Sequence, residues 1–311
     1  MQEKFTPYLK KQFSNQAIAE QYIILPNDIL NKFQSLDPLA EDTHQPVKGL
    51  IHKYGNRALI KVSYRCAAHC RFCTRIRQIG TDEGDIKNDA QVQQMMDYLR
   101  EHIEITDVIL SGGDPLYTPN QTLQLLNELD KIESVRVIRI GTRLPIHNPE
   151  SFKTPLIKKV LERVTEIAAK KPFYILLHFE HPDELTKETI EAIKTIKNTG
   201  VTLLSQTVFL KGINNNFETL KRLFENLYWN GVTPYYMYRC DYVQGLEHFV
   251  CDIEEEIQIM TELRKELSGI ACPTYIVDVE GKGKIPVPLA FWSSTNLLSC
   301  FDFENSKIKL L

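Results

Sequence analysis

Strand and helix signals alternate between residues 57 and 277, and this alternation limits the fold of the chain more than any other feature. The predicted strands span residues 58–62, 107–110, 135–140, 173–177, 201–207, 232–238 and 275–277. The predicted helices span residues 91–102, 120–130, 155–169, 187–198, 217–229 and 253–267. Strands that alternate with helices pair in parallel through right-handed crossovers. The pattern therefore predicts an α/β fold, either a partial parallel (β/α)6-type barrel or a doubly wound open sheet.

Polar residues gather where the predicted strands end, and this placement favours the barrel. They are residues 111–114, Arg143, His178, Gln206, Asp241 and Asp278. In a parallel barrel the C-terminal ends of the strands share one face, and the active site lies on that face. The first predicted strand is not followed by the Gly-rich turn of a dinucleotide-binding open sheet. We therefore expect the partial barrel, with a site at the strand ends.

Composition and charge narrow the class of protein. The chain has 311 residues, of which 43% are hydrophobic and 25% charged, as in a soluble globular protein. A net charge of −3 does not predict binding to nucleic acid. No apolar run approaches the roughly 20 residues that span a bilayer, and no secretory signal is recognised, so a cytoplasmic location is expected. The predicted organisation is a partly helical N-terminal extension (1–52), a barrel (53–290) and a short C-terminal segment (291–311).

Three of the seven cysteines form a C-x3-C-x2-C cluster directly after the first predicted strand: Cys66, Cys70 and Cys73. Three thiolates on a short loop can hold three irons of a [4Fe–4S] cluster, which leaves the fourth iron open for a ligand. His69 could instead complete a four-ligand zinc site, which stays an alternative. The scattered cysteines are expected to be small buried hydrophobic residues. They are Cys240, Cys251, Cys272 and Cys300.

The position and spacing of this loop resemble those of radical S-adenosylmethionine (SAM) enzymes. The segment Ser111-Gly112-Gly113-Asp114-Pro115 is similar to the Gly-Gly-Glu motif of that family, with Asp in place of Glu. The resemblance implies a cluster whose open iron binds SAM, and reductive cleavage of SAM to a 5′-deoxyadenosyl radical. It implies SAM contacts from Gly112, Gly113, Asp114, Arg143 and Gln206. An electron donor such as flavodoxin or ferredoxin is then expected as a partner.

A second loop, residues 278–286, carries Lys282 and Lys284 among glycines, which let the backbone approach a bulky ligand. Together with the cysteines it resembles lysine 2,3-aminomutases from about residue 53 to residue 288. Supporting stretches are residues 73–75, 139–143, 178–182, 240–241 and 245–249. In that family a lysine two residues before a proline carries pyridoxal phosphate (PLP) as a Schiff base. Lys284 precedes Pro286 in this way, and Lys282 is the nearby competitor.

The same resemblance assigns the PLP phosphate to two cations before the cysteine loop. Where the family has two arginines, this chain has Lys53 and Arg57, and Tyr54 between them could pack against the cofactor ring. Lysine keeps the charge but lacks the planar fork of arginine. The alternative is that these residues form a charged strand entrance without a ligand.

The predicted substrate is an amino acid with a cationic side chain. Arg75 matches the arginine that binds the substrate carboxylate in this family, and Asp241 and Asp278 match the pair that binds the lysine ε-ammonium. Two buried carboxylates repel each other unless a cation lies between them. The chain is thus expected to be an isomerase that converts L-lysine to β-lysine. Arginine or another amino acid remains an alternative substrate.

Two alternative hypotheses for the function remain. One is a radical SAM enzyme without PLP that modifies a macromolecule, and the other is a non-catalytic iron–sulfur or zinc-binding regulator. A homo-oligomer is also left open.

Overall fold

The computed structural model describes residues 3–24, 35–81, 86 and 88–289, together with the backbone of 299–301 and 307–309. A curved sheet of nine strands dominates it, and its strands follow one another in chain order from β1 to β9. They are β1 (Leu50–Tyr54), β2 (Arg57–Ser63), β3 (Asp107–Gly112), β4 (Val137–Thr142), β5 (Phe173–His178), β6 (Thr202–Val208), β7 (Thr233–Tyr238), β8 (Thr274–Val279) and β9 (Gly283–Pro286).

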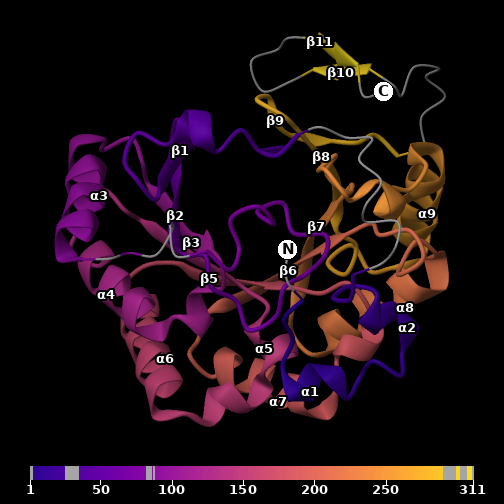
Figure 1. Ribbon diagram of the computed structural model, residues 1–311, viewed down its shortest axis with the longest axis horizontal. Coiled ribbons are helices and arrows are strands. Elements are labelled where there is room, and N and C mark those ends of the chain that lie inside the picture. The colour runs from indigo at the N-terminus through magenta and orange to yellow at the C-terminus, as the bar shows by residue number, and fades with distance from the viewer. Residues whose placement is uncertain are drawn as a thin grey trace.

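The sheet is a partial barrel. Strands β2 to β8 are parallel, and β1 and β9 add antiparallel edges at either end. The two edge strands pair with one neighbour each, so the barrel stays open between β1 and β9, as Figure 1 shows. The predicted α/β partial barrel is confirmed, and the doubly wound open sheet is not formed.

The connecting helices lie along the outside of this sheet (Figure 1). The longer ones are α3 (Asp89–Glu101), α4 (Pro119–Leu129), α6 (Pro155–Ala168), α7 (Lys187–Lys197), α8 (Phe217–Trp229) and α9 (Ile253–Glu266). Four of them begin at a residue whose side chain accepts a first-turn backbone N–H, which satisfies a donor that the helix leaves unpaired. These capping residues are Asn88, Thr186, Asn216 and Asp252. All six helices were predicted to within a few residues.

The two faces of the sheet differ in polarity. On β2, Ala58, Ile60 and Val62 belong to the hydrophobic core, whereas Lys61 is a buried charged residue. Because side chains alternate along a strand, Lys61 and Ser63 project to the face opposite the core residues. The outer face therefore packs against helices, and the concave face carries the polar side chains of a site.

The N-terminal extension covers the cysteine loop. Leu9 from helix α1 (Pro7–Lys10), Ile18 from helix α2 (Gln16–Ala19) and Tyr22, which follows α2, are buried in a small cluster with Ala68. The backbone of the loop is hydrogen-bonded to the extension, for example from Arg71 N to the carbonyl of residue 21 at 2.7 Å. Strand β1 begins at Leu50, before the boundary that the sequence analysis places after residue 52.

The structure describes only part of the predicted C-terminal segment. Of residues 291–311, the structure describes the backbone of β10 (Ser299–Phe301) and β11 (Lys307–Lys309), which pair antiparallel. The side chain of Cys300 lies outside the described residues, whereas Cys240, Cys251 and Cys272 are buried as expected. Within the described part of the chain, no helix combines the length and apolar character needed to cross a membrane.

Candidate active site

The three clustered cysteines follow β2 on one loop, and each thiol is partly buried and free of disulfides. Burial raises the pKa of all three, that of Cys70 to about 11. Among the described residues, no three His, Cys, Asp or Glu side chains converge on a single metal ion. Ligands of a [4Fe–4S] cluster bind one iron each, so three thiols on one short loop fit that group.

The glycines after β3 allow the next segment to lie against the start of this loop. A Cβ on Gly113 would stand 2.3 Å from the carbonyl oxygen of Arg65, and Gly112 has a φ of +103°. Asp114 N donates to the same Arg65 oxygen at 2.9 Å. A larger residue at position 113 would push the β3 end away from the cysteine loop. This close approach is the physical reason for the Gly-Gly pair.

Asp114 braces two strand ends. Its carboxylate accepts hydrogen bonds from Thr142 Oγ1 at 2.8 Å, Arg143 N at 2.8 Å and Leu116 N at 3.0 Å. Burial raises the pKa of Asp114, and these donors partly offset that effect. The structure thus gives the carboxylate an internal role, and a contact between Asp114 and SAM stays a prediction.

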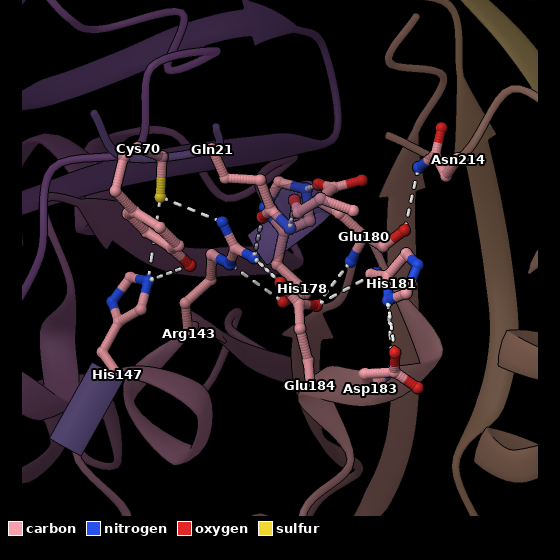
Figure 2. A network of polar contacts seen from close by, with 12 residues as sticks. Gln21, Cys70, Arg143, His147, His178, Glu180, His181, Asp183, Glu184 and Asn214 are labelled. Atoms are coloured by element: carbon pink, nitrogen blue, oxygen red, sulfur yellow. Dashed lines mark hydrogen bonds and ion pairs between the residues drawn. The ribbon is translucent and has the colours of Figure 1, made fainter. Parts of the chain in front are cut away.

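Arg143, also predicted to contact SAM, lies beside a cysteine of the cluster loop (Figure 2). Its Nη1 donates to Cys70 Sγ at 3.0 Å, and its Nη2 lies 2.7 Å from Glu184 Oε1. Nη2 also donates to Gln21 Oε1 at 3.0 Å, and Nε donates to the carbonyl of His178 at 3.1 Å. Sequence reasoning did not find Gln21 or Glu184, because neither belongs to a motif.

Gln206 lies near the same strand ends. On β6 it is in register with His178 at the end of β5, and His178 Nε2 stands 2.6 Å from Glu180 Oε1. The register brings a predicted SAM residue to the face where the cysteine loop begins. Its contact with SAM remains a prediction.

Arg75 is held by a residue that sequence reasoning missed. Glu41 accepts from Arg75 Nε at 2.9 Å through Oε2, and its Oε1 lies 2.5 Å from Nη2. Among the described residues, the other nitrogen, Nη1, meets Ser111 Oγ at 3.4 Å and the Gly112 carbonyl at 3.5 Å. Burial alone would raise the pKa of Glu41, but the nearby cations Arg75 and Lys61 lower it. The guanidinium therefore has one edge filled and its Nη1 side weakly bonded.

Side chains bridge the opening of the barrel between β1 and β9. Lys53 Nζ lies 3.7 Å from Asp278 Oδ1, and the Tyr54 hydroxyl accepts from Lys284 N at 3.2 Å. Lys284 Nζ forms an ion pair with Asp278. Arg57 stacks on the Tyr54 ring, with its guanidinium carbon 4.1 Å from the ring centroid. Four of the residues predicted for PLP and one predicted for the substrate thus meet at this opening.

The charges at the opening interact strongly. Burial and the neighbouring Asp278 raise the pKa of Asp241 to about 7, although Lys284 and Lys53 oppose that shift. Burial alone would lower the pKa of Lys284, but Tyr238 and Asp278 outweigh it and raise the pKa above its ordinary value. Tyr238 was not predicted, and its ring centroid lies 5.3 Å from Lys284 Nζ. Two acids and two lysines therefore share one site, with Asp241 poised to gain or lose its charge near neutral pH.

Comparisons with known proteins show which proteins this chain is similar to. The model of the radical SAM superfamily matches residues 60–224. L-lysine 2,3-aminomutase of Methanococcus maripaludis is 36% identical over 261 residues, which are 83% of this chain and 58% of that protein. Putative L-lysine 2,3-aminomutase of Aquifex aeolicus is 38% identical over 85% of this chain and 71% of that protein.

Two further comparisons extend this set. Glutamate 2,3-aminomutase of Clostridioides difficile is 37% identical over 82% of this chain and 59% of that protein. A solved radical SAM methyltransferase from Sphaerobacter thermophilus has a TM-score of 0.49 and 18% identity, covering 74% of this chain and 68% of that one. The chain thus spans 58% to 71% of the length of these three aminomutases. On the superfamily match and the identity to the aminomutases, the chain belongs to the lysine 2,3-aminomutase family of radical SAM proteins.

Proposed function

We propose that this chain carries out a radical SAM, PLP-dependent isomerisation that moves the amino group of L-lysine from C2 to C3 and yields β-lysine. The observation that supports lysine most directly is the ion pair between Lys284 Nζ and Asp278. The ammonium group of Lys284 binds this carboxylate, so the site suits the ammonium group at the end of a lysine side chain. Asp241 supplies a second carboxylate nearby.

When bound, the cluster with SAM would supply the hydrogen-abstracting radical, and PLP would hold the migrating amino group. Cys66, Cys70 and Cys73 would hold the irons, and Lys284 would carry PLP. Lys53 and Arg57 would face its phosphate, with Tyr54 against its ring. We further propose that the protein works in the cytoplasm and draws its electron from a flavodoxin or ferredoxin.

The charge pattern favours lysine over glutamate, the substrate named for one relative. A glutamate side chain would bring a third carboxylate to Asp241 and Asp278, and like charges at a partly dry site repel. Arginine satisfies the same charge rule and is the second substrate to assay. The test is incubation of reduced, reconstituted protein with SAM and each amino acid, followed by chromatography of the products. β-Lysine is expected, and binding of both cofactors without any turnover would contradict the substrate assignment.

The Arg75→Lys variant is expected to raise the KM for lysine by about ten- to a hundredfold, with a smaller effect on kcat. The ammonium of the introduced lysine lacks the planar fork with which Arg75 can bind Glu41 and a substrate carboxylate at the same time. Each hydrogen bond to a charged group that is lost costs about 1.5–3 kcal/mol, which corresponds to this change in KM. Steady-state kinetics measures the effect. Arg77→Lys is the matched control, because Arg77 pairs with Asp37 and Asp42 instead. Equal changes in both variants would argue against a carboxylate site at Arg75.

A pH profile should show the ionisation of Asp241. Its carboxylate loses its charge as pH falls through about 7, and a neutral acid attracts the substrate ammonium weakly. We therefore expect kcat/KM for lysine to reach a plateau above that pH and to fall about tenfold per unit below it, since this ratio reports the free protein. The Asp241→Asn variant should lose this acidic limb while keeping a low, flat activity. A wild-type profile that is flat between pH 5.5 and 8 would contradict the assignment.

A further inference from the structure

One cysteine of the cluster loop has a buried cation against its sulfur. Arg143 Nη1 donates to Cys70 Sγ at 3.0 Å, and the Arg143 residue is only 6% exposed. The imidazole of His147 also lies near this sulfur: its Nε2 is 3.8 Å from Cys70 Sγ and 3.2 Å from the Tyr22 hydroxyl. Arg143 carries a fixed positive charge, because a guanidinium stays protonated in proteins. The positive charge at this sulfur comes from Arg143.

Fixed partners hold the guanidinium in this position. Nε donates to the carbonyl of His178, and Nη2 meets both Gln21 and Glu184 (Figure 2). Glu184 is fully buried, and its other oxygen accepts from the backbone N–H of Glu180 at 2.7 Å. Both oxygens of Glu184 are thus held by hydrogen bonds, and these contacts restrain Arg143 beside Cys70. Such an arrangement is a preset electrostatic environment for the sulfur.

We propose that Arg143 is a positioning residue for the cluster ligand Cys70 that raises the reduction potential of the iron–sulfur cluster, and that Glu184 is its opposing charge. The proposal rests on the cluster assigned above and goes beyond the substrate. Reduction adds one electron to the cluster, supplied by the donor protein, and moves no proton in this step. Hydrogen bonds to cluster sulfurs and nearby charges set such potentials. A cation at Cys70 stabilises the more negative, reduced cluster, and a buried anion destabilises it.

The two charges predict opposite shifts. Arg143→Gln removes the cation and should lower the potential, whereas Glu184→Gln removes the anion and should raise it. We expect each to change the one-electron equilibrium about tenfold or more, which corresponds to about 59 mV. Arg143→Lys keeps the charge but not the fork, so its potential should lie between those of the wild type and Arg143→Gln.

The experiment is an anaerobic redox titration of the reconstituted protein, followed by electron paramagnetic resonance, without SAM or amino acid. This choice separates the proposal from the lysine assignment, which the titration does not touch. Arg139→Gln is the matched control: Arg139 lies on β4, just before Arg143 in the chain, but it pairs with Asp107. The potential of this variant should stay at the wild-type value. Iron content and thermal unfolding are measured for every variant.

Shifts of the same sign in Arg143→Gln and Glu184→Gln, or no shift in either, would overturn the proposal. If Arg143→Gln does not retain iron, the potentials of Glu184→Gln and Arg143→Lys test the proposal. Glu184→Gln must then lie above the wild type and Arg143→Lys below it, and any other order counts against the inference.

Discussion

The Lys284→Arg variant is expected to lose turnover and Schiff-base absorption completely while keeping the iron content of the parent. Arginine remains protonated in proteins and cannot form the covalent link to PLP that a lysine amine forms. It can still pair with Asp278, so the charge balance at the barrel opening should survive. Absorption spectra with PLP, iron analysis and product assays together measure the result.

Lys282→Arg provides the matched control for that experiment. Lys282 lies in the turn before β9 and Lys284 lies on β9, where it contacts Asp278, Tyr54 and Tyr238. We expect Lys282→Arg to keep the Schiff-base band and most of the activity. The opposite pattern, with the band lost only in Lys282→Arg, would move the cofactor to Lys282.

Asp241→Asn and Asp278→Asn are each expected to lower kcat/KM for lysine by about two to four decades while both cofactors still bind. Removing one partner of a buried charge pair costs about 3–5 kcal/mol, and each factor of ten corresponds to about 1.4 kcal/mol. The Asp278 side chain is only 4% exposed, so solvent screening reduces this cost little. Asp278→Asn also removes the partner of Lys284 and Lys53, so its effect should be the larger of the two.

Asp107→Asn is the control for these variants. Asp107, the first residue of β3, pairs with Arg139 on β4 at 2.8 Å, and a quarter of its side chain is exposed (26%). A partly exposed ion pair contributes only about 0–1 kcal/mol, so this variant should stay within a few-fold of the parent. Iron content and Schiff-base absorption are checked for all three variants. If the variants at positions 241 and 278 also stay within a few-fold, these carboxylates do not recognise the substrate side chain.

Local sequence was sufficient for most of the architecture. The predicted strand at 173–177 and helix at 217–229 coincide almost entirely with β5 and α8, because periodic burial and capping act over a few neighbouring residues. The edge strands β1 and β9 were missed. Each is short and is defined by pairing with one neighbour: β9 pairs with β8 across a tight turn, and β1 with β2 in the same way.

In the site, too, local sequence predicted some features, and the tertiary structure decided others. The spacing of Cys66, Cys70 and Cys73 is a covalent property of one loop, so sequence alone pointed to the cluster. Motif resemblance also predicted Asp278 and Lys284 as site residues, but it did not predict the ion pair between them.

The tertiary structure alone brought together residues from distant segments. Glu41 reaches Arg75 from the N-terminal extension, and Glu184 reaches Arg143 from beyond the next strand. Neither acid belongs to a motif, and an acidic residue in a loop is ordinarily a solvated surface group. Their burial beside an arginine depends on the curvature of the whole sheet and on the extension packed against it. Local propensity and motif spacing therefore determined the fold class and pointed to the candidate cofactor ligands, whereas long-range packing decided which charges lie beside those residues.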